Sequence, residues 1–228
     1  MSKQQAKTLV LLYCGIYLFL FPLIETGLIK LFDTSVIVSV LNVLEWGFYL
    51  TFPVIMVYVV WPWFRREFYL FCHDPFKNLI HILKNYGLMM ISSILVNLIL
   101  VPVFHLEQSG NQSSIIELYA QQPLKVMFAA LVFAPIVEEL VFRGSFYAPF
   151  RKNQRLFGLL FSSFLFGFLH VYQSLFAGNF MDLLYIFSYG LLGSFMCRVY
   201  DKTNSFFSCV LLHFLNNFIS IILTFLIV

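Results

Sequence analysis

Charged residues are scarce in this 228-residue sequence, where they make up 11% of the positions. Soluble domains carry roughly 25%, and the 29 phenylalanines present here would be hard to bury in one aqueous core. The hydrophobic fraction is 61% and the mean hydropathy is +0.87. The composition therefore excludes an ordinary soluble domain and predicts an integral membrane protein. The net charge of +3 is too small and too dispersed to indicate nucleic-acid binding.

A CxxC motif and a signal-peptide cleavage site are also missing. No CxxC pair occurs, and each cysteine lies in or beside an apolar run, so we interpret all of them as small buried hydrophobes rather than disulfides or metal ligands. They are Cys14, Cys72, Cys197 and Cys209. The N-terminus has a basic start and an apolar run, as a signal peptide does, but no small-x-small cleavage site follows. We therefore expect an uncleaved first span.

Long apolar runs dominate what is present. A membrane-crossing helix needs about 20 mostly apolar residues, and the sequence offers about seven such runs, which predict an all-α polytopic membrane helix bundle. The runs are Thr8–Leu31, Val36–Phe64, Leu79–Phe104, Leu124–Phe146, Leu156–Phe176, Phe180–Val199 and Phe206–Val228. The second run is overlong and contains Pro53 and Pro62, so we expect it to be kinked or tilted. Pro135, in the fourth run, should leave a backbone carbonyl exposed near the polar residues that follow.

Basic residues in the loops predict the orientation of the bundle. With seven crossings, most of them fall on one side, and they are Lys3, Lys7, Arg65, Arg66, Lys77, Arg151, Lys152, Arg155, Arg198 and Lys202. The opposite side has Lys30, Lys125 and a polar loop from His105 to Gln122. The positive-inside rule then predicts a cytoplasmic N-terminus and an external C-terminus.

Two adjacent glutamates lie inside the fourth run, in PIVEELVFRG. Charged groups at membrane depth are costly, so they are normally paired or functional. Glu139 and Arg143 stand at i and i+4 with the acid first, the favourable direction for an ion pair on a helix. Glu138 lies about 140° around the helix from Arg143 and cannot easily share that cation. It is thus a candidate proton acceptor, or, alternatively, a protonated group that hydrogen-bonds between helices.

Further polar side chains occur in the fifth and seventh runs. His170 ends the sequence FGFLH, and His213 and Asn217 project from one face of a helix in HFLNN, with Asn216 turned about 100° away as a structural residue. Each alone is more typical of interhelix hydrogen bonding. Counted at about 1.5 Å per residue, however, the three clusters lie at similar depths. They can therefore converge on a cavity with one group to deprotonate water and others to stabilise an oxyanion.

Together these motifs resemble those of a known family. EELVFR (Glu138–Arg143), FGFLH (Phe166–His170) and HFLNN (His213–Asn217) are similar to the EExxxR, FxxxH and HxxxN motifs of the CAAX protease and bacteriocin-processing (Abi) family of intramembrane proteases. The resemblance covers residues 124–228 as a catalytic core. Residues 1–123 form N-terminal membrane helices with no recognised motif, in one integrated membrane domain.

The resemblance implies an all-helical membrane endopeptidase with a specific division of roles. Glu138 would activate the hydrolytic water with His170, and His213 and Asn217 would form the oxyanion site. Glu139 and Arg143 would brace the arrangement.

The resemblance leaves the cofactor and the substrate open. Glu138, His170 and His213 could hold Zn²⁺ in a three-ligand site, whereas HExxH is absent and a metal-free glutamate mechanism fits equally well. The partners implied are membrane lipids and a peptide or protein substrate cleaved close to the membrane. The short, Phe-rich chain resembles bacterial members, which are associated with peptide or bacteriocin maturation and self-immunity, so we expect a bacterial cell membrane.

Two other functions are compatible with the sequence. A non-catalytic membrane adaptor of the same fold could bind a partner such as a sensor kinase or peptide toxin, although it would not need a base and an oxyanion site. A small proton-coupled transporter could use Glu138 and the histidines as a relay. The sequence shows neither the internal repeat nor the paired broken helices that would favour transport.

Overall fold

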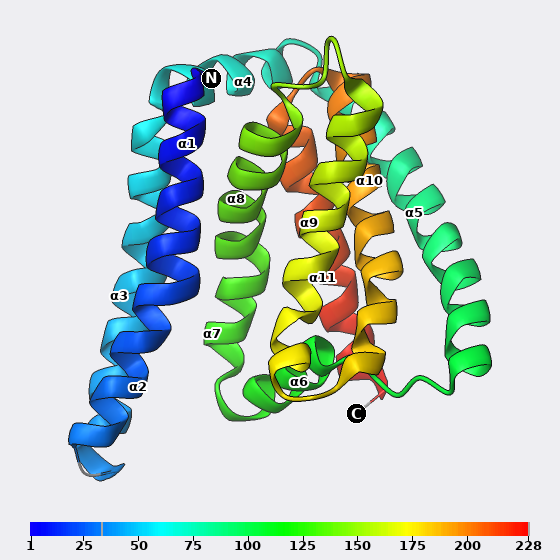
Figure 1. Ribbon diagram of the computed structural model, residues 1–228. Helices are drawn as coiled ribbons and strands as arrows, with labels where there is room; N and C mark the ends of the chain where they lie inside the picture. The colour runs from blue at the N-terminus through cyan, green and yellow to red at the C-terminus, as the bar shows by residue number, and fades with distance from the viewer. Residues whose placement is uncertain (33, 228) are drawn as a thin grey trace.

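The computed structural model of the protein describes residues 1–32 and 34–227, and its regular elements are helical throughout that range (Figure 1). The predicted all-α polytopic membrane bundle is confirmed. Six helical stretches of the described chain are long and apolar enough to cross a membrane. They are Lys3–Leu31, Val36–Val59, Pro75–Phe104, Arg155–Phe176, Phe180–Thr203 and Phe206–Thr224.

The predicted fourth span is helical but differs from these six in composition. It runs without a break as α7 (Pro123–Phe128), η2 (Ala129–Phe133), α8 (Ala134–Glu139) and η3 (Leu140–Tyr147), of which η2 and η3 are π-helical. It carries three charged side chains, Glu138, Glu139 and Arg143, within six residues. It nevertheless begins at the end of the bundle where α6 lies and finishes at the other (Figure 1). It therefore follows the path predicted for the fourth span, although it is not one of the six apolar stretches.

The first span begins five residues earlier than predicted, because Ser2 and Gln5 cap it reciprocally. The Ser2 hydroxyl accepts from the Gln5 N–H at 3.1 Å, and the Ser2 N–H donates to the Gln5 side chain at 3.0 Å. The helix continues through α1 (Lys3–Leu11), the π-helical η1 (Leu12–Leu20) and α2 (Phe21–Leu31).

The second span is interrupted where a kink was expected. Helix α3 (Thr34–Val59) accommodates Pro53 in its interior, and Val60 leaves the helical conformation directly before α4 (Trp61–His73), which has Pro62 in its first turn. The predicted end at Phe64 was therefore five residues too late. Helix α4 lies across one end of the bundle, beside the N-terminus (Figure 1).

The remaining helices follow the predicted runs closely. They are α5 (Pro75–Phe104), α9 (Arg155–Phe176), η4 (Phe180–Leu184) with α10 (Tyr185–Thr203), and α11 (Phe206–Ile227). Val228, the last residue of the predicted seventh span, lies outside the described residues. An unexpected helix, α6 (Gly110–Gln121), forms within the polar loop after α5, where the Ser109 side chain accepts from the Gln112 N–H.

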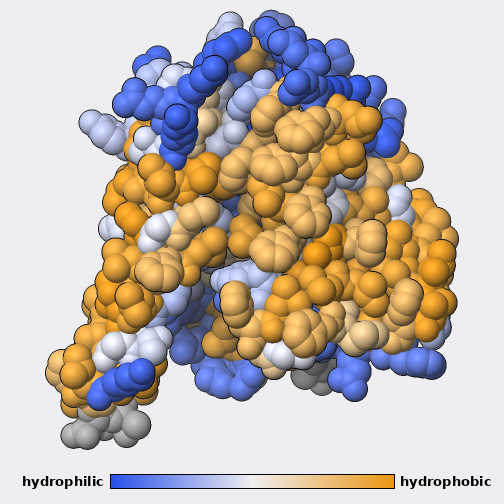
Figure 2. Space-filling model, in the orientation of Figure 1, coloured by the Kyte–Doolittle hydropathy of each residue, from blue (hydrophilic) through white to orange (hydrophobic). Residues whose placement is uncertain are grey.

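The surface confirms a multi-pass membrane protein. On the face that Figure 2 shows, apolar residues cover the middle of the bundle and hydrophilic residues gather at its ends, above all at the end with α4 and the N-terminus. Large apolar side chains of the spans are open to the outside, such as Tyr58 at 79%, Leu98 at 65% and Phe19 at 70% exposure. A soluble monomer rarely exposes so continuous an apolar surface.

The cysteines form no disulfide, as predicted, but only half of them are buried. Cys197 and Cys209 lie in the interior, whereas Cys14 and Cys72 are exposed. The interpretation of all four as buried hydrophobes was thus wrong for two of them. A span in lipid does not need to bury an apolar side chain within the protein, and hydropathy alone cannot distinguish the two situations.

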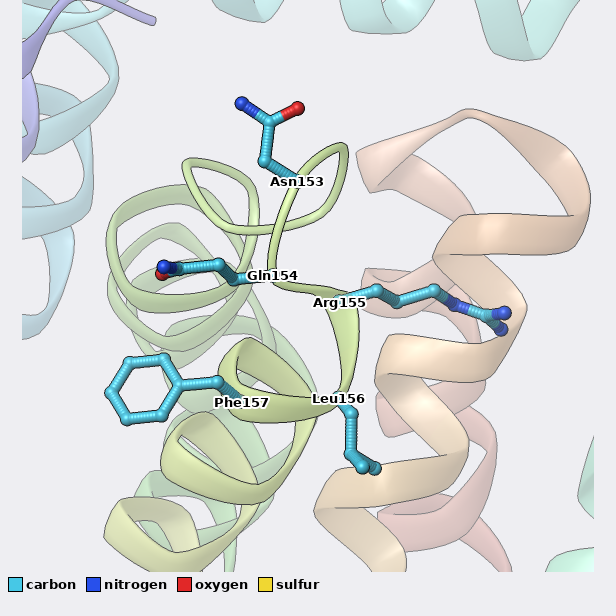
Figure 3. A pocket seen from close by; sticks show the side chains of 5 residues that line it. All are labelled: Asn153, Gln154, Arg155, Leu156 and Phe157. Atoms are coloured by element: carbon cyan, nitrogen blue, oxygen red, sulfur yellow. The ribbon is translucent and has the colours of Figure 1, made fainter.

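A surface hollow of about 630 Å³ opens at the turn into α9 (Figure 3). Its lining consists of five consecutive residues, Asn153 to Phe157. Arg155 in this lining is mostly exposed and pairs with Asp201. The hollow therefore belongs to the polar end of the bundle.

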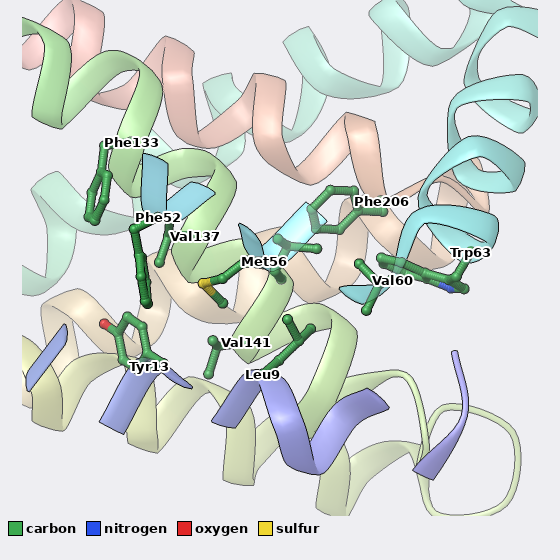
Figure 4. Close-up of a cluster of buried hydrophobic side chains, with 11 residues drawn as sticks. Leu9, Tyr13, Phe52, Met56, Val60, Trp63, Phe133, Val137, Val141 and Phe206 are labelled. Atoms are coloured by element: carbon green, nitrogen blue, oxygen red, sulfur yellow. The ribbon is translucent and has the colours of Figure 1, made fainter. Parts of the chain in front are cut away.

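A buried apolar cluster joins the N-terminal helices to the polar fourth crossing (Figure 4). Leu9 and Tyr13 from the first span, and Met56 from α3, pack against Val137 and Val141. A hydrogen bond from the Phe206 N–H to Glu67 of α4, at 2.9 Å, adds α11 to this assembly. Close van der Waals packing holds helices together in lipid. The first span and α3 therefore support the polar helix directly.

Candidate active site

Glu139 is the centre of a fully buried polar cluster. Its Oε1 accepts from Arg143 Nη1 at 2.9 Å, which confirms the predicted i,i+4 ion pair. The same oxygen accepts from His213 Nδ1 at 2.9 Å, across to α11. Because an ionised carboxylate can only accept, His213 carries its hydrogen on Nδ1 and presents Nε2 away from Glu139. Glu139 thus orients an imidazole as well as neutralising the arginine.

Arg143 is held on three sides in the interior, where its side chain has no exposed surface. Besides Glu139, it donates from Nη2 to the Gly193 carbonyl of α10 at 2.9 Å. Its guanidinium carbon lies 4.7 Å from the centroid of the Phe166 ring of α9. A carboxylate, a carbonyl and an aromatic face compensate most of the buried guanidinium, although Nε has no hydrogen-bond partner among the described residues. Arg143 therefore links the polar helix to α9 and α10.

His170 is oriented by its own helix. Its Nδ1 lies 2.7 Å from the Phe166 carbonyl, which can only accept, so Nδ1 carries the hydrogen and a neutral ring leaves Nε2 as an acceptor. The Phe166 ring contacts both histidines, with centroid distances of 4.5 Å to His170 and 5.8 Å to His213. The two imidazoles predicted from separate helices are thus brought to one side chain.

Glu138 lies beside these groups but outside their hydrogen bonds. It interacts electrostatically with His170. His170 interacts in the same way with His213 and Arg143. It also interacts with Tyr13 of the first span. Its Oε2 is buried and has no hydrogen-bond partner among the described residues. Glu139 Oε2 is unpartnered as well, so the two acids differ in their bonded partners: Arg143 and His213 bind Glu139 and not Glu138, as the predicted separation requires.

Asn217 compensates for the proline in the polar helix. In the π-helical η2, the Ala134 N–H bonds to the Ala129 carbonyl, and the N–H that would reach Ala130 is absent because position 135 is proline. Asn217 Nδ2 donates to that Ala130 carbonyl at 2.8 Å. The carbonyl predicted to be freed by Pro135 is thus bonded to a predicted site residue, whose second amide hydrogen stays available.

Helix α10 contributes to the site although no motif marks it. A Cβ added to Gly167 of α9 would lie 2.7 Å from the Ile186 carbonyl of α10, and one added to Gly193 would lie 3.3 Å from Arg143 Nη2. The missing side chains let α9 and α10 approach closely. Consequently Tyr189 reaches His170, with ring centroids 4.5 Å apart and planes at 23°. Glycines spaced along neighbouring spans are the one sequence signal that could have indicated this approach.

The predicted zinc ligands do not assemble. Among the residues that the structure describes, no three side chains of His, Cys, Asp or Glu lie together closely enough to hold an ion. The Nδ1 atoms of His170 and His213 are hydrogen-bonded, which leaves each Nε2 free, but these nitrogens and the Glu138 carboxylate are not gathered around one point. The donor set Glu138, His170 and His213 therefore does not fit a metal as arranged here.

The hollow of Figure 3 is separate from this cluster. Its lining residue Arg155 begins α9, and His170 lies fifteen positions further along the same helix, roughly 22 Å away at 1.5 Å per residue. The candidate active site is thus an interior polar layer rather than a surface cavity.

Comparison with known proteins agrees with the motifs. Residues 120–219 match the family described as type II CAAX prenyl endopeptidase Rce1-like. A relative from Lactococcus lactis subsp. lactis (strain IL1403), the UPF0177 protein YvdC, is 26% identical over 142 residues, which make up 62% of this chain and 51% of the relative. The chain thus matches about half the length of that relative. No solved structure matches it. The resemblance seen in the three motifs is confirmed, and the segment that matches the Rce1-like family, residues 120–219, holds every predicted site residue.

Proposed function

We propose that this protein is an intramembrane endopeptidase that hydrolyses a peptide bond in a membrane-associated peptide or protein. One observation carries the proposal: of two adjacent glutamates, Glu139 is bonded through Oε1 to Arg143 and His213, whereas Glu138 makes no hydrogen bond to a described residue and interacts electrostatically with His170. Each acid has an unpartnered Oε2, but only Glu138 has neither a cation nor an imidazole bonded to it. A base needs a free oxygen within reach of water.

In this reaction the chain's own groups move the protons. Glu138 takes a proton from water, while Nε2 of His170 accepts from the other O–H of the same water and fixes its direction. The water oxygen bonds to the carbonyl carbon, and the C=O electron pair moves to the oxygen. Glu138 then delivers the proton to the amide nitrogen as the C–N bond breaks. The hydroxyl of the water thus ends on the carboxyl product, and its proton ends on the amine product.

Stabilisation of the oxyanion falls to α11. The free N–H of Asn217 can donate to it, and so can Nε2 of His213 when that nitrogen also carries a hydrogen. Both side chains are already oriented by a hydrogen bond, from His213 Nδ1 to Glu139 and from Asn217 Nδ2 to the Ala130 carbonyl. Donors fixed before the reaction need not be reorganised when charge develops.

The biological setting is part of the same proposal. The relative in a lactococcal strain and the short, Phe-rich chain favour a bacterial cell membrane, with maturation of a peptide or bacteriocin, or self-immunity, as the role. The basic end of the bundle would then face the cytoplasm.

The decisive experiment compares the full-length protein with Glu138→Gln, His170→Ala and His213→Ala variants in proteoliposomes. The probe is a fluorogenic farnesylated CAAX peptide, and peptide termini are also compared by proteomics in cells that carry the wild type or Glu138→Gln. We expect each substitution to reduce cleavage by about 10²-fold or more at unchanged protein level. Full activity in all three variants would contradict the proposal. Variants that fail to cleave yet still complement a deletion would favour an adaptor.

A further inference from the structure

Tyr189 is the aromatic residue of α10 that lies against the candidate active site without belonging to any of its motifs. Its ring stacks on the imidazole of His170, with centroids 4.5 Å apart and planes at 23°. Its hydroxyl lies 2.9 Å from Ser109 Oγ and accepts from Asn111 Nδ2 at 3.3 Å. The side chain is thus fixed at both ends, by an imidazole at one and by the beginning of α6 at the other.

The anchor at the beginning of α6 is itself well held. Ser109 is buried and caps α6, and the Gly110 N–H donates to Asp182 Oδ2 at 2.8 Å. Asn179 Nδ2 donates to the other oxygen of Asp182 at 3.1 Å. A Cβ at Gly110 would lie 2.5 Å from Ser174 Oγ and 3.0 Å from Asp182 Oδ2, so a larger residue there would displace these side chains. The loop between α5 and α6 is therefore tied to the α9–α10 connection rather than lying free.

His170 needs such a support because its own hydrogen bond fixes only one atom. The bond from Nδ1 to the Phe166 carbonyl leaves the ring plane free to tilt about that contact. Phe166 and Tyr189 both contact the imidazole with centroids at 4.5 Å. Phe166 is engaged by Arg143 as well, whereas Tyr189 is engaged by α6. The direction of Nε2 thus depends on both rings.

We propose that Tyr189 is a positioning residue for His170, holding the imidazole plane through its stacked ring while Ser109 and Asn111 hold its hydroxyl. The inference rests on the proposed peptidase activity for its kinetic consequence. Its structural part, the dependence of the His170 orientation on Tyr189, stands apart from catalysis. Through this contact, the polar loop at the end of the bundle opposite α4 sets the geometry of a group in the interior.

Two variants separate the contribution of the Tyr189 ring from that of its hydroxyl. Tyr189→Phe keeps the stacked ring and loses both hydrogen bonds, so we expect a small fall in kcat. Tyr189→Leu removes the ring, and we expect kcat to fall about 10- to 100-fold with little change in KM, because misorientation affects the reaction more than substrate binding. Tyr185→Phe is the matched control. Its hydroxyl also contacts the loop before α6, at the Glu107 carbonyl, but its ring has no contact with His170, and it should keep the wild-type kcat.

A second measurement does not depend on cleavage. In full-length protein labelled at histidine and held in detergent micelles, the ring-proton resonances of His170, assigned with His170→Gln, report the stacked tyrosine through its ring current. We expect them to move in Tyr189→Leu and to stay near their wild-type positions in Tyr189→Phe and Tyr185→Phe. Unchanged His170 resonances in Tyr189→Leu would overturn the proposal, as would equal kcat in the folded Leu variant and the wild type. Absence of cleavage by the wild type would instead refute the proposed function, and the resonances would still decide the role of Tyr189.

Discussion

At the scale of single residues, the neighbouring acids Glu138 and Glu139 have different bonding partners. Helix geometry predicts that Glu139, and not Glu138, faces Arg143, and the structure confirms this contact at 2.9 Å. The bond from His213 to Glu139 could not be predicted, because it joins positions 74 residues apart on different helices. Spacing along one helix defines its faces, but the partner of each face depends on how the helices pack.

This difference predicts opposite effects on stability. Glu139→Gln leaves the buried Arg143 without a charged partner, which should cost about 3–5 kcal/mol and lower the midpoint of thermal unfolding in detergent micelles. Glu138→Gln removes a carboxylate that makes no hydrogen bond through Oε2, so its midpoint should equal or exceed that of the wild type. A lower midpoint for Glu138→Gln than for Glu139→Gln would mean that the roles of the two acids have been exchanged.

At the scale of helices, the polar fourth crossing is stabilised by its neighbours. The Ala130 carbonyl, left without a backbone donor because of Pro135, is bonded by Asn217. We expect Asn217→Leu to cost about 1–3 kcal/mol in unfolding free energy, since it leaves a buried carbonyl unpaired. In a Pro135→Ala background the cost should be smaller, because the restored backbone N–H can reach the same carbonyl. Equal costs in both backgrounds, measured as a double-mutant cycle, would show that Asn217 and Pro135 are not coupled.

The contact between α9 and α10 gives a second prediction at this scale. Gly167→Ala would place a Cβ 2.7 Å from the Ile186 carbonyl, forcing the helices apart, so we expect a loss of about 1–3 kcal/mol together with lower peptidase activity. Gly87→Ala, in α5, is the matched control, because nothing lies within 4 Å of its added Cβ. It should be neutral or stabilise by up to about 1 kcal/mol. A Gly167→Ala variant as stable as Gly87→Ala would contradict the close approach.

Individual helices also show what the sequence could and could not predict. Hydropathy located the apolar spans to within a few residues, because lipid requires long apolar segments of a fixed minimum length. It missed α6, whose start depends on the Ser109 cap and on the distant Asp182. It also gave no indication of α4 as a separate helix, since an apolar run does not show where a chain turns at the membrane surface. The three residues considered as possible metal ligands, Glu138, His170 and His213, do not lie close enough together to hold an ion, because their separation depends on how the helices pack.

At the scale of the whole molecule, the position of the basic residues gives the bundle a direction. The N-terminus, α4 and the turn between α10 and α11 lie at one end, and α6 lies at the other (Figure 1). Arg65, Arg66 and Lys77 are at the first end, as the orientation predicted from the sequence requires. The candidate site would then receive its water from the cytoplasmic side, and the loop that anchors Tyr189 would face outward.

Two exposed positions test this orientation directly. Cys72 is an exposed cysteine of α4, and Cys197 and Cys209 are buried, whereas Cys14 is exposed in the middle of the apolar first span, where an impermeant reagent does not reach. A membrane-impermeant maleimide should therefore label Cys72 in inside-out vesicles and not in intact cells, and Cys72→Ser should abolish that labelling. In the Cys72→Ser background, Ser114→Cys, at an exposed position of α6, should be labelled from outside in intact cells. The reverse pattern would place the basic end outside, against the positive-inside rule, and would require water and substrate to reach Glu138 from the external face.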